Sequence, residues 1–146
     1  DSRNNNGLNS KRYIYQRVIS SKSLKDLLIF HHKHKTELQP YHISTCWNKA
    51  TQFIRNERQT INSNQGIFLP LINHTYRRVK DFDAPSLART IHGIAKITSQ
   101  TRLVINPSFW KTLEEEAMKM EKIEAQQISN ILWGFAKVKQ SAPELF

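Results

Sequence analysis

Apolar residues recur along this chain at spacings of three and four, which is the period of an amphipathic helix, and no stretch shows the alternation of a β-strand. The first regular stretch follows Ser23, which together with an acidic residue three positions later resembles a capping box. We therefore predict a helix that begins after Ser23. Its inward-facing positions are Leu24, Leu27, Leu28 and His31.

The same spacing predicts helices at about residues 41–55 and 67–80, with a polar loop over residues 56–66. Pro70 falls in the first turn of the second helix, where its missing N–H does no harm. The residues expected to face inward are Ile43, Trp47, Ala50, Ile54, Phe68, Ile72, Tyr76 and Val79.

Two helix starts are marked by a capping residue and a proline, at Asp83 with Pro85 and at Asn106 with Pro107. A last helix is expected over residues 125–139. The inward-facing residues of these three helices are expected to be Leu87, Ile91, Ile94, Ala95, Phe109, Leu113, Ala117, Met120, Ile128, Leu132, Phe135 and Ala136.

The chain contains an internal repeat, because ARTIHGIAKIT at residues 88–98 returns as SNILWGFAKVK at residues 129–139. The offset is 41 residues, and a shift of 44 aligns the first helix pair with the second. Three helix–loop–helix units, each too small to bury its apolar faces alone, predict an all-α stack of the α-solenoid type. The repeated Gly93 and Gly134 are expected to let a neighbouring helix approach closely.

The expected domain covers residues 21–146, and residues 1–20 are expected to be a flexible basic arm with at most a helical turn or two in its basic-aromatic part, KRYIYQRVISS. The net charge of +10 lies entirely in the first half, since residues 1–80 hold 14 Lys and Arg against four acidic residues. Residues 81–146 hold eight of each. Such an uneven charge favours nucleic acid or an anionic membrane surface as the partner. The alternative is that the basic residues serve only to keep the protein soluble.

Signs of catalysis or metal binding are weak. His31, His32 and His34 lack the cysteine partners of a structural zinc site, and we expect a polar helix end. The single cysteine, Cys46, is expected to be a small buried residue. No triad or phosphate loop is found, so we expect neither an enzyme nor a cofactor or metal. The longest apolar run is six residues, which predicts no membrane span.

The second helices, FDAPSLARTIHGIAKIT and IEAQQISNILWGFAKVK, resemble octotricopeptide repeats. The second copy is the better match and carries the Trp133 and Lys137 of the family pattern, whereas the first has Arg89 and His92 at positions of Asn and Trp. The resemblance covers about residues 20–146. It implies an α-solenoid that binds single-stranded RNA in chloroplasts or mitochondria and acts in RNA stability, splicing, translation or ribosome assembly.

Independently of the family, each second helix has a polar face, and stacked units would align these faces in one groove. The alternative is the solvated face of any amphipathic helix. Six residues are expected to face bases: His42, Thr45, Ser86, Arg89, Gln127 and Asn130. Three are expected to neutralise phosphates: Lys49, Lys96 and Lys137.

Two further basic clusters are candidates for phosphate contacts on a folded RNA such as rRNA, with solvated helix ends as the alternative. The first cluster mixes basic and aromatic residues and consists of Lys11, Arg12, Tyr13, Tyr15 and Arg17. The second cluster is basic and consists of Arg77, Arg78 and Lys80.

A second hypothesis is a scaffold subunit inside a large organellar assembly such as a ribosome. In the repeat register, Pro143 and Leu145 fall just before the point where another helix would begin. The outer apolar face of the last unit is therefore expected to be covered by protein neighbours. A membrane-surface role is a third reading.

Overall fold

The computed structural model describes residues 2–141, and these form eight α-helices, two short 3₁₀ segments and no strand. The predicted all-α class is confirmed. Pro143 and Leu145 lie outside the described residues. The elements are α1 (Ser2–Ile19), α2 (Leu24–His34), α3 (Pro40–Thr51), α4 (Ile54–Ser63), η1 (Gln65–Phe68), α5 (Leu69–Arg78), η2 (Val79–Asp81), α6 (Ala84–Gln100), α7 (Pro107–Met118) and α8 (Ala125–Ser141).

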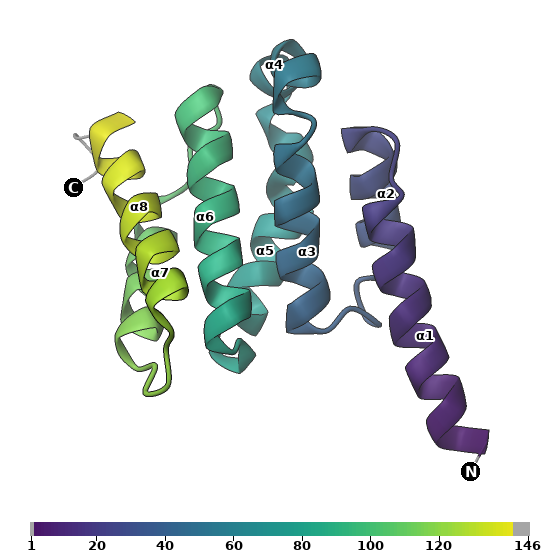
Figure 1. Ribbon diagram of the computed structural model, residues 1–146. Coiled ribbons are helices and arrows are strands. Elements are labelled where there is room, and N and C mark those ends of the chain that lie inside the picture. The colour runs from purple at the N-terminus through teal and green to yellow at the C-terminus, as the bar shows by residue number, and fades with distance from the viewer. Residues whose placement is uncertain (1, 142–146) are drawn as a thin grey trace.

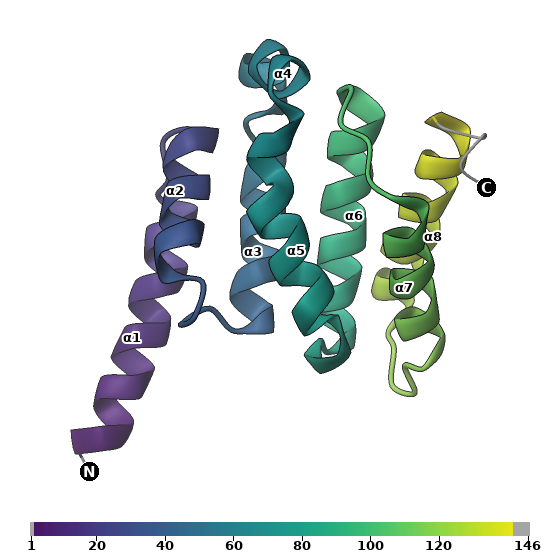
Figure 2. The same cartoon turned by 180° about the vertical axis from the view of Figure 1, so that it is seen from behind.

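The helices lie in two rows. Helices α1, α3, α6 and α8 stand side by side in one row (Figure 1), and α2, α5 and α7 lie behind them (Figure 2). The most extensive contacts are those of α6 with α3 and with α8. The second helices of the three predicted units, α3, α6 and α8, are thus neighbours in one row (Figure 1).

The expected helix starts are confirmed by their capping hydrogen bonds. The Ser23 hydroxyl accepts the N–H of Asp26 at 3.0 Å, at the start of α2. Asp83 caps α6 through a 2.8 Å bond, and Asn106 caps α7 through a 2.9 Å bond. Each cap pairs a backbone N–H that the helix leaves without an intrahelical partner.

The two rows are held together by a core in which Trp47 is fully buried. Its ring stacks on Phe68 with centroids 5.7 Å apart. Its Nε1 donates a 2.9 Å hydrogen bond to Oγ1 of Thr75 on α5, so the indole is buried without losing its polar partner.

The two repeated glycines occupy equivalent contacts, as the sequence predicts. A methyl group added at Gly93 would lie 3.2 Å from the carbonyl oxygen of Trp47 on α3. One added at Gly134 would lie 2.7 Å from Cγ2 of Ile91 on α6. Since Trp47 and Ile91 correspond at the offset of 44, the contact between neighbouring helices recurs in the same register.

The expected flexible arm is wrong, because residues 2–19 form helix α1. Ile14 and Val18 are buried in its contact with the rest of the fold. Arg17 forms an ion pair with Asp26 of α2 at 2.6 Å and lies over the Phe30 ring. Apolar positions four residues apart are enough to attach a polar helix to its neighbours.

The expected loop over residues 56–66 is also wrong, since most of it is helix α4. The preceding helix ends earlier than predicted, at Thr51. Ile54 and Ile61, two turns apart, are buried and anchor α4. Apart from these two isoleucines the residues of α4 are polar, and a segment of that composition is easily taken for a loop, which explains the error.

The inward face of α8 differs from the prediction. Ile128 and Leu132 are exposed, whereas Ile131 and Val138 are buried. Ile91, the residue of α6 equivalent to Leu132, lies against Gly134 of α8, but among the described residues nothing covers Leu132. Tyr76, also expected inward, is 53% exposed. None of the helices in the described range is long and apolar enough to cross a membrane.

Candidate nucleic-acid interface

A shallow cavity of about 390 Å³ is lined by residues of α3, α6 and α8. In the front row α6 stands between the other two helices (Figure 1). It brings together three residues predicted to face bases, Arg89, Gln127 and Asn130. The other residues that line it are Asn48, Pro85, Ala88, His92, Glu124 and Gln126. Most of these side chains can donate or accept hydrogen bonds, as readout of an unpaired base requires.

The three predicted residues are held by polar contacts, of Arg89 with the buried Ser44 and of the two amides with other residues of the cavity. Nη1 of Arg89 donates to the Ser44 hydroxyl at 3.1 Å. The side-chain oxygen of Gln127 accepts the Glu124 N–H at 3.0 Å, and the Asn130 oxygen accepts from Gln126 at 3.2 Å. The side-chain amide N–H groups of Gln127 and Asn130 are not used in these bonds.

Trp133 and His92 form an aromatic stack beside the cavity, with ring centroids 4.5 Å apart. Nζ of Lys137 lies 5.9 Å from the Trp133 centroid, which gives a cation–π contact. Burial, with the charge of Lys96 adding to it, lowers the pKa of His92, so this imidazole is neutral at pH 7. Trp133 is 37% exposed and offers part of its ring to solvent.

A second cavity of about 390 Å³ lies between α1 and α3. Tyr15 and Tyr41 stack there with centroids 5.7 Å apart, beside Lys11 and Arg12. The guanidinium of Arg89 lies 5.7 Å from the Tyr41 ring, so one residue of the first cavity also contacts the second. Basic groups beside open aromatic rings suit the phosphates and bases of a single strand.

We call the surface that joins the two cavities the row face. It is defined by Tyr41, Asn48, Arg89, His92, Asn130 and Trp133.

Three residues predicted to face bases are buried instead. Thr45 is 6% exposed and donates to the Tyr41 carbonyl, and Ser86 is 2% exposed. His42 is 3% exposed; its Nδ1 accepts the Gln39 N–H, and its Nε2 lies 3.2 Å from the Lys11 carbonyl oxygen. Because a helix turns 100° per residue, a small rotation moves such positions from the open surface into a helix contact.

The three lysines predicted to meet phosphates are half-buried along the same row. Lys49 donates to Gln52 at 3.0 Å and lies over the Phe53 ring. Lys96 stands near His92, and Lys137 lies over Trp133.

The basic clusters are divided between different surfaces. Arg12 and Tyr13 are exposed on α1, next to the second cavity. Arg17 is engaged with Asp26, as described above. Arg77 and Arg78 belong to α5 in the other row, where Arg78 pairs with Asp81 at 3.2 Å. The structure therefore does not bring Arg17, Arg77 or Arg78 to the row face.

Sequence reasoning missed Asn48, Tyr41 and the role of His92. A signal was present, because the offsets of 44 and 41 place Asn48, His92 and Trp133 in one column, one helical turn beyond Thr45, Arg89 and Asn130. In the missed column Asn48 and Trp133 are exposed and His92 is half-buried, whereas Thr45 of the predicted column is buried.

His31 and Cys46 have structural roles, because both side chains are packed inside the fold. His31 is fully buried, which confirms its predicted place on the inward face of α2 and not the expected polar helix end, and its Nε2 lies 2.9 Å from Nδ1 of His74. Cys46 is buried as expected, and burial raises the pKa of its thiol to about 12. No group of three or more potential metal ligands occurs within residues 2–141.

Comparison of the chain with family models, curated proteins and solved structures returns no match.

Proposed function

We propose that this chain is a non-catalytic RNA-binding helical-repeat protein of the octotricopeptide type, acting in organellar gene expression through the row face. The observation that carries the proposal is the convergence of Arg89, Gln127 and Asn130 in one cavity beside the Trp133–His92 stack. Open aromatic rings, free amide groups and a guanidinium are the side chains that recognise unpaired bases.

In this proposal a single strand crosses the helices of the front row. One base stacks on the exposed part of Trp133, and another stacks on Tyr41, which is 47% exposed. Arg89, between the two rings, contacts a base edge or a phosphate. Lys11, Arg12, Lys96 and Lys137 supply positive charge along the path, and the first two belong to the basic first half of the chain.

The proposal includes an α-solenoid of about three units. The recurrence of the glycine contact, Gly93 on Trp47 and Gly134 on Ile91, supports this arrangement. So does the division of the paired helices between two rows (Figure 2). The proposed location in an organelle, and the proposed role in RNA stability, translation or ribosome assembly, rest on the resemblance to octotricopeptide repeats.

The test is the affinity of the full chain for short single-stranded RNAs of different sequence, measured over a salt series. Arg89→Gln and Asn130→Ala are expected to weaken binding and to reduce the difference between sequences. Arg77→Gln, which removes the same charge from the other row, is the matched control and is expected to change affinity little. Equal losses from Arg89→Gln and Arg77→Gln would point to diffuse charge attraction and against the row face.

A second candidate function is a scaffold subunit within an organellar assembly such as a ribosome, where the chain contacts rRNA or protein neighbours. The exposed apolar residues on the outer side of the last unit favour it. Met118 is 81% exposed, Leu132 64% and Ile128 41%. Weak, sequence-blind RNA binding together with a tight protein partner that is lost in Leu132→Glu would favour this function over the first.

A further inference from the structure

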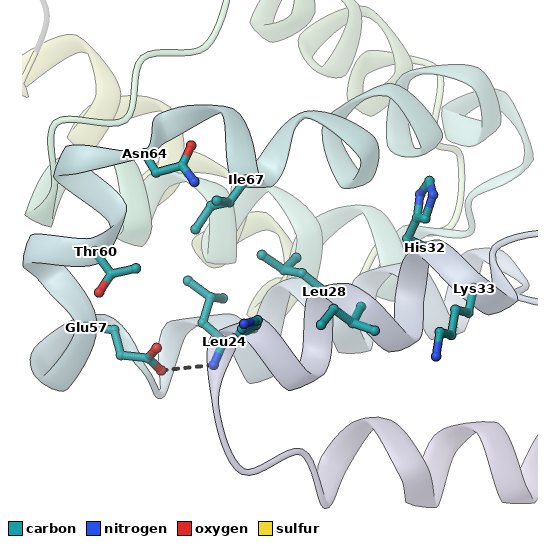
Figure 3. Close-up of a pocket in the computed structure, with 10 residues that line it drawn as sticks. Leu24, Leu28, His32, Lys33, Glu57, Thr60, Asn64 and Ile67 are labelled. Carbon is teal, nitrogen blue, oxygen red and sulfur yellow. Dashed lines mark hydrogen bonds between the residues drawn. The ribbon is translucent and has the colours of Figure 1, made fainter.

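An apolar groove of about 530 Å³ lies between α2 and the segment formed by α4 and η1 (Figure 3). The groove is separate from both cavities of the row face and shares no lining residue with them. Leu24 and Leu28 of α2 and Ile67 of η1 line it from its two sides. Nothing in the proposed RNA binding uses it.

The groove follows from the way α4 is attached. Near the C-terminal end of α2, His31 contacts His74 of α5. At its other end, a carboxylate oxygen of Glu57 accepts the backbone N–H of Leu24 at 2.9 Å, so α4 is fixed against the start of α2 (Figure 3). Between these two attachments Leu24 is buried and Leu28 packs partly against the core, whereas Ile29 is exposed and lines the groove.

Two rows of side chains run along the groove on α2, each with a spacing of four residues. The inner row is Leu24, Leu28 and His32, and the outer row is Lys25, Ile29 and Lys33. Ile29, an apolar residue flanked by two lysines, is 44% exposed. The groove thus has an apolar floor and a basic rim.

The charged residues on the rim favour an acidic partner. Lys25, Lys33 and His32 border the groove. The one carboxylate among its lining residues, that of Glu57, already accepts a hydrogen bond from the Leu24 N–H. Carboxylates on an occupant would therefore meet basic groups of opposite charge along the outer row. Charge complementarity of this kind sets orientation and excludes basic partners.

We propose that this groove binds an amphipathic helix of a partner protein, with apolar side chains in the groove and Asp or Glu residues against Lys25 and Lys33. From Leu24 to Lys33 the helix α2 rises by about 14 Å, the length of two to three turns of a bound helix. Two or three apolar anchors at helical spacing would fill it, as in other helix-in-groove complexes. A free acyl chain is a poorer fit, because the groove is open along one side and small-ligand sites usually enclose most of the ligand.

The inference is independent of the proposed function, and the experiment separates the two. A library of displayed 14-residue helical peptides is selected against the full chain, and the selected peptides are then measured by fluorescence anisotropy. We expect peptides with Leu, Ile or Phe at helical spacing, flanked by Asp or Glu. Ile29→Glu is expected to weaken their binding by about tenfold or more while RNA affinity is retained.

Two matched variants make the result decisive. Leu132→Glu changes an exposed apolar residue elsewhere and is expected to leave peptide binding unchanged. The double variant Lys25→Glu/Lys33→Glu is expected to reverse the preference from acidic to basic peptides, a gain that unfolding cannot produce. The proposal is overturned if no selected peptide depends on Ile29, if the double variant keeps the acidic preference, or if laurate binds in the groove and the peptides do not.

Discussion

Nε2 of His31 lies 2.9 Å from Nδ1 of His74, and this contact joins α2 to α5 inside the fold. Both side chains are buried. Burial is the main reason why the pKa of His31 is lowered to about 3 and that of His74 to about 4, and neighbouring positive charges lower both further. The pair is therefore neutral at pH 7.

This pair predicts that the protein loses stability in mild acid. An unfolded histidine has a pKa of about 6.5, so between about pH 6.5 and pH 4 the unfolded chain binds more protons than the folded one. The stabilisation is fully present above about pH 6.5 and is lost as the pH falls, at up to about 1.4 kcal/mol per pH unit for each histidine. Urea unfolding at several pH values above and below 6 measures this.

The double variant His31→Gln/His74→Gln should show a weaker pH dependence over that range. His32→Gln, at an exposed position of the same helix, is the control and should keep the dependence of the parent chain. An unchanged slope in the double variant would show that other groups cause the effect.

Gly134→Ala is expected to destabilise the fold. The new methyl group would lie 2.7 Å from Cγ2 of Ile91, which is fully buried and cannot move aside. Overpacking of this kind costs about 1–3 kcal/mol, which outweighs the roughly 1 kcal/mol gained in helix propensity. Gly66→Ala is the control, because its nearest neighbour would be 3.8 Å away. Thermal unfolding measures the stability of both variants. If Gly66→Ala lowered the unfolding temperature more than Gly134→Ala, the close contact at Gly134 would be contradicted.

Thr75→Val is expected to destabilise the fold by about 1–3 kcal/mol, because it leaves the buried Trp47 N–H without an acceptor. Thr75→Ser keeps the hydroxyl and should lose much less. Chemical unfolding of the two variants separates the hydrogen bond from the packing of the side chain. If both variants lost a similar amount of unfolding free energy, the packing of the Thr75 methyl group, rather than the hydrogen bond of its hydroxyl, would be what stabilises the fold.

Tyr41→Ala is expected to weaken single-stranded RNA binding by about 1–3 kcal/mol, the usual value for loss of one stacked base. Tyr76, similarly exposed but in the other row, supplies the control variant Tyr76→Ala. Titration of a labelled RNA with each variant gives the comparison. If Tyr76→Ala lost as much affinity as Tyr41→Ala, the aromatic contacts would lie elsewhere than on the row face.

The sequence predicts those features whose cause is local or repeated. The caps at Ser23, Asp83 and Asn106 need only a side-chain oxygen near the first free N–H groups of a helix. The glycine contacts follow from the internal repeat, because Gly93 and Gly134 share a register. These signals do not depend on what lies elsewhere in the fold.

Other features depend on tertiary packing and are not visible in the pattern. Helix α4 is held against the rest of the fold by Ile54 and Ile61, and its other residues are polar, as in a loop. In the candidate site, the offsets assign Thr45, Arg89 and Asn130 to one column, but they do not fix the helix rotation that buries Thr45 and leaves Asn48 open. Exposure depends on neighbours that periodicity alone does not specify.

The contact at Gly134 has a consequence for the surface as well as for the interior. The rings of His92 and Trp133 belong to adjacent helices, and they can stack only while those helices remain as near to each other as a residue without a side chain permits. The buried Gly134 therefore sets the geometry of the aromatic pair although it lies away from the surface. A larger residue at this position would move α8 away from α6 and change the stacking of His92 on Trp133, even in molecules that still fold.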